Sequence, residues 1–317
     1  MSKLVTILIP VHNEQESIPE LVSRINNVIS GLPQYRWEIL MVNDGSTDNS
    51  LLLMRQLHAE NPQYRYIDLS RNYGKEVAML AGMDHARGDA VVILDADLQD
   101  PPEILPQMIE AWEQGYDDIY ARRNDRGRES WLRRVMTRCY YRLLSRLSST
   151  PVLQNVGDFR LLDRRCVDAL CSMRESQRYT KGLYSWIGFN KKEITFDRHD
   201  RVAGRSKWSL VKLFSLAVEG ITSSSTRPLK LASLLGFSIS LLAAVYIVWI
   251  VIKTLAFGET VQGYPTLMVT ILFLGGIQLL TIGIIGEYVG RIFNETKNRP
   301  TYFVREIDGI ERENDKK

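Results

Sequence analysis

Two long runs without a charged residue dominate the C-terminal third of the chain, Leu231–Ile252 and Val261–Gly286. Each run exceeds the ~20 apolar residues that an α-helix needs to cross a bilayer. The alternative is a pair of helices buried in a large soluble core, but such helices rarely lack charged residues over this length. The sequence therefore predicts two transmembrane helices, at about 231–252 and 262–286, which leaves residues 1–226 to form a separate domain.

Only Lys253–Thr260 separates the two runs, so we expect them to form a tight helical hairpin within residues 227–290. Basic residues flank the hairpin at its two outer ends: Arg227, Lys230, Arg291, Lys297, Arg299 and Arg305. The positive-inside rule then places both termini, including the tail 291–317, in the cytosol and the short loop on the other side. Lys253, which lies in that loop, weakly opposes this orientation. The sequence thus predicts a multi-pass membrane protein with a cytosolic N-terminal domain.

Short β-branched runs alternate with helical patterns along the first part of the N-terminal domain. The predicted strands are Val5–Ile9, which Pro10 should end, Trp37–Val42, Tyr64–Leu69 and Ala90–Leu94. The predicted helices are 16–29, 50–59, 76–86 and 102–113. Alternation of strands and helices is typical of an α/β fold with a mainly parallel sheet. We therefore expect an α/β fold for this domain.

Two carboxylates, Asp95 and Asp97, directly follow the last of these strands. Ligands of an open α/β sheet collect outside the carboxyl ends of its parallel strands. Two acidic side chains at that edge repel each other unless a cation lies beside them. Polar segments also follow the other three strands, at 10–14, 43–48 and 70–75. We expect the four loops to meet in one crevice; the alternative is a set of ordinary loops whose polar residues cap helices.

Composition excludes several classes of function. The net charge of +3 gives no indication of nucleic-acid binding. The four histidines and three cysteines show no metal-ligand spacing, and we expect the cysteines to be reduced thiols. The chain has no Gly-x-Gly-x-x-Gly segment and no Walker lysine loop, which disfavours a Rossmann dehydrogenase or a P-loop enzyme.

Four segments carry a resemblance to a known family. They are Pro10-Val11-His12-Asn13-Glu14, Asn43-Asp44-Gly45-Ser46, Asn72-Tyr73-Gly74-Lys75 and Leu94-Asp95-Ala96-Asp97-Leu98-Gln99-Asp100-Pro101-Pro102. Together with the hairpin and Gly286–Ile292, they resemble the inverting glycosyltransferases of family 2, and among these the polyisoprenyl-phosphate glycosyltransferases. Bactoprenol glucosyltransferases and dolichol-phosphate mannose synthases belong to this group. The resemblance implies a GT-A fold at the cytoplasmic face of an inner membrane. The chain departs from it at His12, where many relatives have Tyr, and at Asn43, where many have Asp.

The resemblance implies a nucleotide-sugar donor, with UDP-glucose expected, and a divalent cation, Mg²⁺ or Mn²⁺. It assigns the metal to Asp95 and Asp97, where the cation would neutralise the leaving nucleoside diphosphate. The residues that it places around the nucleotide sugar are Pro10, Asn13, Glu14, Asp44, Arg71, Lys75, Asp95 and Gln99. It counts Asp97 among the catalytic residues and gives Asp158 an orienting or base role beside the reaction centre. The alternative for Asp158 is an aspartate that only stabilises a turn.

The acceptor implied by the resemblance is a polyprenyl phosphate, such as undecaprenyl phosphate. A phosphate monoester has its second pKa near ~6 and is already anionic at neutral pH, so a strong general base is not obligatory. Arg201, Ser206 and Lys207 match the loop that binds the acceptor phosphate in the family. The alternative is a basic surface loop beside anionic lipid headgroups.

Two further segments have the basic, amphipathic pattern of helices that lie in the membrane interface, at about 129–147 and 208–221. Ordinary core-facing helices remain the alternative for both. The segment 301–304 reads as a short strand that docks on the N-terminal domain or on a neighbouring molecule. By resemblance we expect a homo-oligomer, with a tetramer as the candidate assembly.

The sequence hypothesis is inverting transfer of a sugar, most simply glucose from UDP-glucose, to undecaprenyl phosphate for modification of a cell-surface glycan such as the O-antigen of lipopolysaccharide. Three alternatives remain open. The donor could instead be GDP-mannose or a UDP-aminoarabinose derivative. A processive polysaccharide synthase is disfavoured because the chain has no Gln-x-x-Arg-Trp motif. A non-catalytic membrane partner could also keep the same fold.

Overall fold

The computed structural model describes residues 2–123, 156–176, 178–196 and 263–311, together with scattered positions between 236 and 252. The chain divides into two compact units. One unit contains the β-sheet and the residues from Pro300 onward, and the other contains the long helix α10 (Tyr264–Thr296).

The described part of the first unit is built on a sheet of nine strands. These are β1 (Leu4–Val11), β2 (Arg36–Asn43), β3 (Tyr64–Leu69), β4 (Ala90–Ile93), β5 (Asp118–Arg123), β6 (Val156–Asp163), β7 (Lys191–Phe196), β8 (Val304–Ile307) and β9 (Ile310–Glu311). Their spatial order is β7-β5-β6-β4-β1-β2-β3-β8-β9. Strands β1 to β4 run parallel, whereas β6 and β8 pair antiparallel with the two edges of that parallel block. The prediction of a mainly parallel α/β sheet is confirmed.

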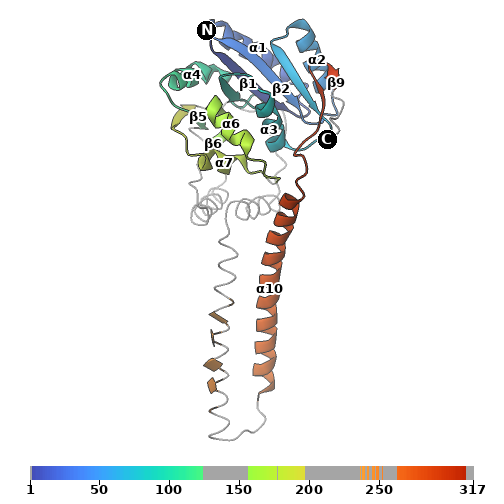
Figure 1. Ribbon diagram of the computed structural model, residues 1–317, viewed down its shortest axis with the longest axis vertical. Coiled ribbons are helices and arrows are strands. Elements are labelled where there is room, and N and C mark those ends of the chain that lie inside the picture. Colours follow the sequence, from blue (N-terminus) through green and yellow to red (C-terminus); the bar gives the residue numbers. More distant parts are fainter. Residues whose placement is uncertain are drawn as a thin grey trace. The chain divides into compact units, whose positions relative to one another are not determined.

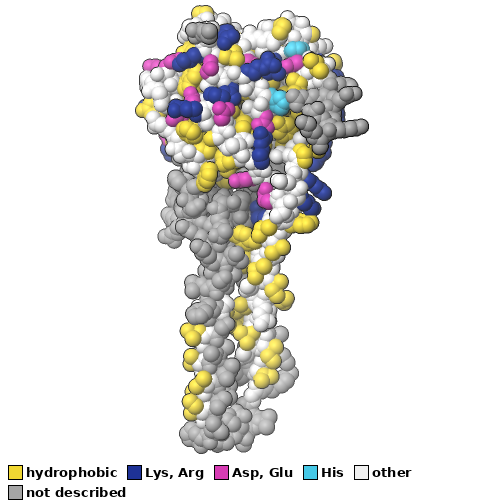
Figure 2. All heavy atoms as spheres, in the orientation of Figure 1, with side chains coloured by type: hydrophobic (Ala, Val, Ile, Leu, Met, Phe, Trp, Pro, Cys, Tyr) yellow, Lys and Arg dark blue, Asp and Glu magenta, His cyan; other side chains and the backbone are white. Residues whose placement is uncertain are grey.

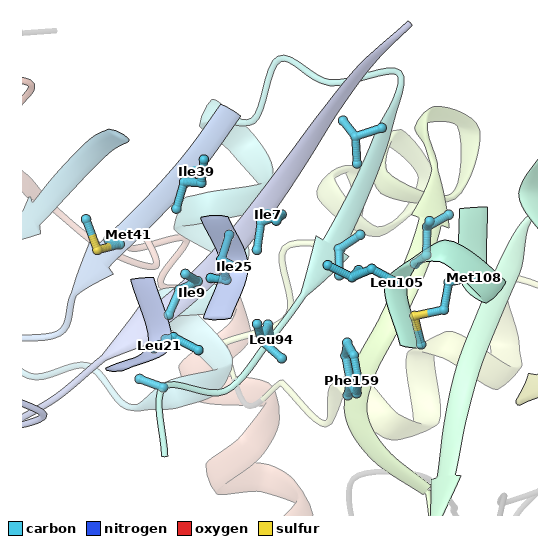
Figure 3. Packing of buried hydrophobic residues seen from close by; sticks show 14 of the residues in the cluster. Ile7, Ile9, Leu21, Ile25, Ile39, Met41, Leu94, Leu105, Met108 and Phe159 are labelled. Carbon is cyan, nitrogen blue, oxygen red and sulfur yellow. The ribbon is translucent and has the colours of Figure 1, made fainter. Parts of the chain in front are cut away.

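Helices cover both faces of the sheet (Figure 1). They are α1 (Ile18–Ser30), α2 (Ser50–Glu60), α3 (Lys75–His85), α4 (Leu105–Glu113) with the 3₁₀ turn η1 (Pro102–Ile104) before it, α6 (Arg164–Ser172) and α7 (Thr180–Trp186). On one face α1, α2 and α4 pack with the sheet into a core that includes Ile7, Ile25 and Met108 (Figure 3). On the other face α3, α6 and α7 form a second core around Leu8 and Tyr184. The domain therefore has three layers, and all four predicted strands and four predicted helices form within it.

Pro10 lies inside β1, although the sequence analysis expected it to end the strand. The next residue, Val11, still bonds to the neighbouring strand, since its carbonyl oxygen accepts from Asp44 N at 2.8 Å. Alternate residues of β1 face β4 instead, and β4 ends at Ile93, opposite Leu8. The nitrogen of Pro10, which carries no hydrogen, therefore faces the side of β4 but lies beyond the last residue of that strand. The sheet loses no hydrogen bond there.

Helix α10 contains the segment Phe273–Thr296, which is long and apolar enough to cross a membrane and has none of its length buried within the structure. Its apolar side chains face outward along the helix (Figure 2). The helix continues ten residues past Gly286, the predicted end of the second apolar run, and in this extension Glu287 and Arg291 pair with each other at i and i+4. The first predicted span lies mostly outside the described residues, so the two-helix hairpin stays a prediction. The predicted interfacial helices 129–147 and 208–221 also lie outside them.

The residues after α10 return to the sheet. The prediction of a docking strand is confirmed in kind, but the strand begins at Val304 rather than at Thr301. It pairs antiparallel with β3, and the register shifts between Asp68 and Leu69. Just beyond the two ends of this pairing, Ser70 N donates to the carbonyl oxygen of Phe303 at 2.9 Å and Asp308 N donates to that of Tyr66 at 3.1 Å. The tail therefore covers the edge of the sheet that β3 would otherwise expose.

Candidate active site

A pocket of about 310 Å³ opens at the carboxyl ends of the central parallel strands. Its lining comes from all four polar loops: Pro10, Val11, His12, Glu14, Asp44, Asn72, Gly74, Lys75, Ala78, Asp95, Ala96 and Asp97. The prediction that these loops meet in one crevice is confirmed. Six of the residues expected around the donor or metal line it directly: Pro10, Glu14, Asp44, Lys75, Asp95 and Asp97.

The ammonium group of Lys75 joins two carboxylates beside this pocket. Lys75 Nζ lies 2.6 Å from Asp95 Oδ1 and 2.6 Å from Asp158 Oδ2. Lys75 begins α3, whereas Asp95 follows β4 and Asp158 lies on β6. Because β6 pairs antiparallel with β4, it carries Asp158 to the same end of the sheet as Asp95. Asp158 thus belongs to the site by position, and Lys75 supplies the positive charge in contact with both carboxylates.

The two carboxylates respond differently to this environment. Burial raises the pKa of Asp95; Lys75 lowers it, but Asp158 and Asp97 raise it again, and the net direction is upward. For Asp158, burial opposes ionisation, but Lys75, Lys181 and Arg160 outweigh it and hold its pKa below the ordinary value. Asp158 is therefore ionised at neutral pH, as an orienting group or base requires. The upward shift of the Asp95 pKa comes first from its burial and then from the neighbouring carboxylates.

The loop that carries Asp97 is held in a strained conformation. Leu98 has a φ of +60°, in the left-handed region that a branched side chain rarely adopts. The Asp97 carboxylate accepts a hydrogen bond from Gln99 N at 3.2 Å, which stabilises this turn. Gln99, expected near the donor, is buried and does not line the pocket. Strain of this kind persists where the surrounding structure fixes a functional loop.

Asp44 ties two of the pocket loops together. Its carboxylate accepts from Tyr73 N at 2.7 Å and from Gly74 N at 2.9 Å. The next residue, Gly45, has a φ of +63°, and a Cβ there would lie 2.4 Å from Asn72 N. Glycine therefore lets the loop after β2 touch the loop after β3. Asp44 lines the pocket, but its carboxylate also shapes the pocket wall.

The other residues expected near the nucleotide also hold the loops in place. Asn13 has a φ of +58°, and its side-chain oxygen accepts from Thr47 N at 2.8 Å rather than facing the pocket. The Glu14 carboxylate accepts from the hydroxyl of Ser17 at 2.7 Å. Arg71 stacks on the ring of Tyr73, with its guanidinium carbon 4.3 Å from the ring centre, and does not line the pocket. The expected acceptor residues Arg201, Ser206 and Lys207 lie outside the described residues.

His12 and Asn43, the two residues that depart from the family pattern, each make side-chain hydrogen bonds to neighbouring residues. His12 Nδ1 donates to the carbonyl oxygen of Asp44 at 2.9 Å, and Asn72 Nδ2 lies 3.2 Å from the same ring. Asn43 Nδ2 donates to Asp68 Oδ1 at 2.7 Å. An amide at position 43 therefore suits a buried carboxylate at position 68, whereas a second carboxylate would repel it.

Several residues around Asp158 were missed by sequence reasoning. Glu76, next to Lys75, accepts from Thr180 N at 3.1 Å and so joins α3 to α7. Arg160 is buried, pairs with Asp118 at 3.1 Å and stacks 3.4 Å from the ring centre of Tyr184. These contacts join segments that are far apart in the chain and share no motif, so no sequence signal could have found them.

The carboxylates beside the pocket fit a hard divalent cation. Within the described ranges no three acidic, histidine or cysteine side chains are grouped to hold a metal by themselves. Mg²⁺, however, is commonly bound by one or two carboxylates plus the phosphates of its substrate. Asp95 and Asp97 both line the pocket, so two carboxylates share this side of it. Asp95 and Asp97 therefore suit a cation that arrives with a nucleoside diphosphate.

Comparison with known proteins shows the family to which the chain belongs. Residues 6–171 match the model of glycosyl transferase family 2, and residues 227–292 match that of the GtrB C-terminal hairpin. The chain is 42% identical over 306 residues to the uncharacterized glycosyltransferase sll0501 of Synechocystis sp., with 96% of each protein covered. It is 42% identical over 301 residues to the SfII prophage-derived bactoprenol glucosyl transferase of Shigella flexneri, with 95% of this chain and 97% of that protein covered.

A third relative is the prophage bactoprenol glucosyl transferase homolog of Escherichia coli (strain K12), which is 40% identical over 303 residues, with 96% of this chain and 99% of the relative covered. Among solved structures, a glucosyl-3-phosphoglycerate synthase from Mycobacterium tuberculosis with Mg²⁺ and UDP aligns with a TM-score of 0.49 and 18% identity, over 69% of this chain and 77% of that one. Since these relatives match nearly the whole length of the chain, it belongs to glycosyl transferase family 2 and is a glycosyltransferase with a GT-A fold.

Proposed function

We propose that the protein transfers a sugar from a nucleotide-sugar donor to a polyprenyl phosphate at the cytoplasmic face of a membrane, with inversion at the anomeric carbon. The names of the bactoprenol glucosyl transferase relatives support the lipid acceptor and, more specifically, glucose as the sugar. We take UDP-glucose as the donor and undecaprenyl phosphate as the acceptor. The product would supply glucose for modification of a cell-surface glycan.

One observation carries the proposal: Lys75 brings the carboxylates of Asp95 and Asp158 together beside a pocket built by four strand-end loops. A protein that had kept only the fold would have no need for two buried, charged carboxylates at this edge, because burying them costs free energy. The arrangement therefore favours a catalytic protein over a non-catalytic membrane partner.

In the proposed reaction, a phosphate oxygen of the acceptor attacks the anomeric carbon of the donor. The new bond forms as the bond from that carbon to the diphosphate oxygen breaks, and the bonding electrons leave with the nucleoside diphosphate. A divalent cation held by Asp95 and Asp97 would supply charge neutralisation for this leaving group. The acceptor oxygen is already anionic near neutral pH, so the main task of the protein is alignment of two negatively charged substrates.

Asp158 would orient the acceptor or accept a residual proton from it; its lowered pKa keeps it ionised but weakens it as a base, which favours the orienting role. Pro10, Glu14, Asp44 and Lys75 would hold the donor, with Asn13, Arg71 and Gln99 shaping the loops around it. Arg201, Ser206 and Lys207 would bind the acceptor phosphate through charge-assisted hydrogen bonds. The proposed assembly is a homo-oligomer anchored by two membrane helices.

The test is a transfer assay with the full-length protein in membranes. The mixture contains Mg²⁺, undecaprenyl phosphate and labelled UDP-glucose, and the label extracted into organic solvent is measured. We expect lipid label with the wild type and almost none with Asp97→Ala, whereas Asp168→Asn, at an exposed carboxylate on α6, should keep full activity. Label from GDP-mannose or a UDP-aminoarabinose derivative alone would reassign the donor. No label from any of these donors would reject the proposed function.

A further inference from the structure

The strand that follows α10 in the chain contacts the loops of the donor pocket through one side chain. Arg305 Nη1 lies 3.3 Å from Asp68 Oδ2, and Arg305 Nη2 donates to the carbonyl oxygen of Ser70 at 2.8 Å. Asp68 is the penultimate residue of β3 and is 1% exposed. A buried carboxylate needs hydrogen bonds and a cation beside it, and Arg305 is the cation that the structure places in contact with it.

Asp68 in turn holds the loop after β2. Its other oxygen accepts from Asn43 Nδ2 at 2.7 Å, and the Asn43 side-chain oxygen accepts from Ser46 N at 3.2 Å. The loop between these residues carries Asp44, which lines the pocket. Through this Arg305–Asp68–Asn43 bridge, the tail fixes the turn that presents Asp44.

Arg305 acts on the loop after β3 as well. Its bond to Ser70 lies at the start of the segment that leads to Asn72 and Lys75, both of which line the pocket. The Asp44 carboxylate then joins this loop to the loop after β2 through Tyr73 N and Gly74 N. One guanidinium group thus contacts the base of the loop after β3 directly and reaches the loop after β2 through Asp68 and Asn43, and the Asp44 carboxylate bonds the two loops to each other.

A second arginine provides a structural comparison. Arg55, on α2, pairs with Glu306, the next residue of the same tail strand, and Glu306 also accepts from the hydroxyl of Tyr66. These contacts fix the tail to the sheet, but neither Arg55 nor Glu306 lines the pocket or bonds to its loops. Docking of the tail and organisation of the loops therefore depend on different side chains.

We propose that Arg305 is a positioning residue of the donor pocket, through which the C-terminal tail holds the loops after β2 and β3 in the conformation that binds the nucleoside diphosphate. This inference rests on the proposed function, since it takes the pocket to be the donor site. Loss of Arg305 leaves Asp68 buried without its cation, so the bridge to Asn43 is weakened and the loops lose preorganisation. Lys75 and Asp158 do not contact the bridge, so the reacting groups stay in place.

The experiment compares Arg305→Met with Arg55→Met in the full-length protein in nanodiscs. Binding of UDP is measured by calorimetry, and KM for UDP-glucose and kcat are measured by lipid labelling. We expect Arg305→Met to raise both the Kd for UDP and the donor KM about tenfold, which corresponds to loss of one charge-assisted interaction, with kcat within about twofold. Arg55→Met should leave the Kd and KM unchanged, and Arg305→Lys should recover most of the affinity.

An unchanged KM in Arg305→Met, or an equal rise in Arg55→Met, would overturn the inference, because the tail would then act only through general stability. If Arg305→Met does not fold, Arg305→Gln, which keeps a donor for the Ser70 carbonyl, carries the same test with the same criteria. A wild-type protein that binds no UDP would reject the proposed function instead. The two failures are therefore distinguishable.

Discussion

At the scale of single residues, Asp158 combines burial, a lowered pKa and contact with Lys75. We predict that Asp158→Asn, which keeps the shape but removes the charge, lowers kcat by about 10² or more and leaves the donor KM nearly unchanged. The measurement is a steady-state assay of lipid labelling at saturating acceptor. A variant with full kcat would show that Asp158 only neutralises Lys75.

Asn43 gives a second prediction at this scale. Asn43→Asp would place a carboxylate against the buried Asp68, with the half-exposed Arg305 as the shared cation. We expect a loss of about 1–3 kcal/mol in the free energy of unfolding at neutral pH, measured by denaturation in detergent. Asp68→Asn added to this variant should recover much of the loss, because it restores an amide–carboxylate pair. Wild-type stability in the single variant would contradict the prediction.

The sequence predicted the residues of the pocket better than their contacts. Asp95 and Asp97 could be found because they directly follow an apolar strand, and the structure places both at the pocket. Lys75 was expected beside the nucleotide, yet its ammonium group joins Asp95 to Asp158. No spacing in the chain indicates this contact, since it depends on β6 entering the sheet next to β4 from a distant part of the sequence.

At the scale of elements, the approach of the loops after β2 and β3 depends on Gly45. We predict that Gly45→Ala costs about 1–3 kcal/mol in unfolding free energy and weakens UDP binding, because its Cβ would lie 2.4 Å from Asn72 N at a left-handed φ. Gly31→Ala is the control: Gly31 has a φ of −78°, and a Cβ there would meet its nearest neighbour at 3.4 Å. Calorimetric titration with UDP checks both variants. Equal affinities for the two would refute the role of Gly45.

The tail strand β8 yields a pH prediction. Burial raises the pKa of Glu306, but its bonds with Arg55 and Tyr66 outweigh burial and lower it below the ordinary value. A lowered pKa in the folded state means that the carboxylate stabilises the fold above its unfolded pKa of ~4.3, and that this stabilisation disappears as the pH falls through the folded pKa. Glu306→Gln should therefore cost about 1 kcal/mol at pH 7, a modest value since Arg55 is half exposed. The cost should vanish in strong acid.

The measurement for this prediction is the difference in unfolding free energy between wild type and Glu306→Gln across the acid range. A difference that grows as the pH falls has the wrong sign and would contradict it. Protection of the β8 amides from hydrogen exchange should fall over the same pH range, because Glu306, which forms the ion pair, is itself a residue of β8.

Strands and helices that have a local sequence pattern could be predicted, whereas the strands with which they pair in the sheet could not. The strand Tyr64–Leu69 was predicted with its observed bounds, because a short segment rich in aromatic and aliphatic residues ends there at a polar turn. Pro10 was misplaced because the rule that proline ends a strand depends on which neighbour its nitrogen faces, and that is set by the short length of β4. The antiparallel positions of β6 and β8 arise from pairings between distant segments, which no local pattern encodes.

At the scale of the whole molecule, apolar composition made predictable one helix that is long and apolar enough to cross a membrane. The segment Phe273–Thr296 exposes apolar side chains that the described structure does not cover, including Leu279, Ile282 and Phe293. In water, an exposed apolar surface of this kind would drive association, whereas the lipids of a bilayer would solvate it. The sequence predicted a docking strand after this helix but could not show that it joins β3, because that pairing depends on charges of β3 and α2 meeting those of β8.

The docked tail makes a prediction about topology. Because β8 pairs with β3, residues 304–307 lie on the same side of any membrane as the N-terminal domain. If α10 crosses the bilayer, its first residues lie on the opposite side, and a second span must return the chain between residue 196 and Gly263. From the basic residues at the outer ends of the two apolar runs, the positive-inside rule predicts that the sheet lies on the cytosolic side.

Thiol labelling checks this arrangement in a variant whose three native cysteines are replaced by alanine. Thr260→Cys should react with a membrane-impermeant maleimide in intact spheroplasts, whereas Lys316→Cys should react only after the membrane is permeabilised. Neither substitution lies in β3 or β8, so we expect both variants to keep transfer activity, which serves as the check that each protein is folded. Equal labelling of both positions in intact spheroplasts would mean that α10 does not cross the membrane, and its uncovered apolar surface would then have to be buried against another molecule.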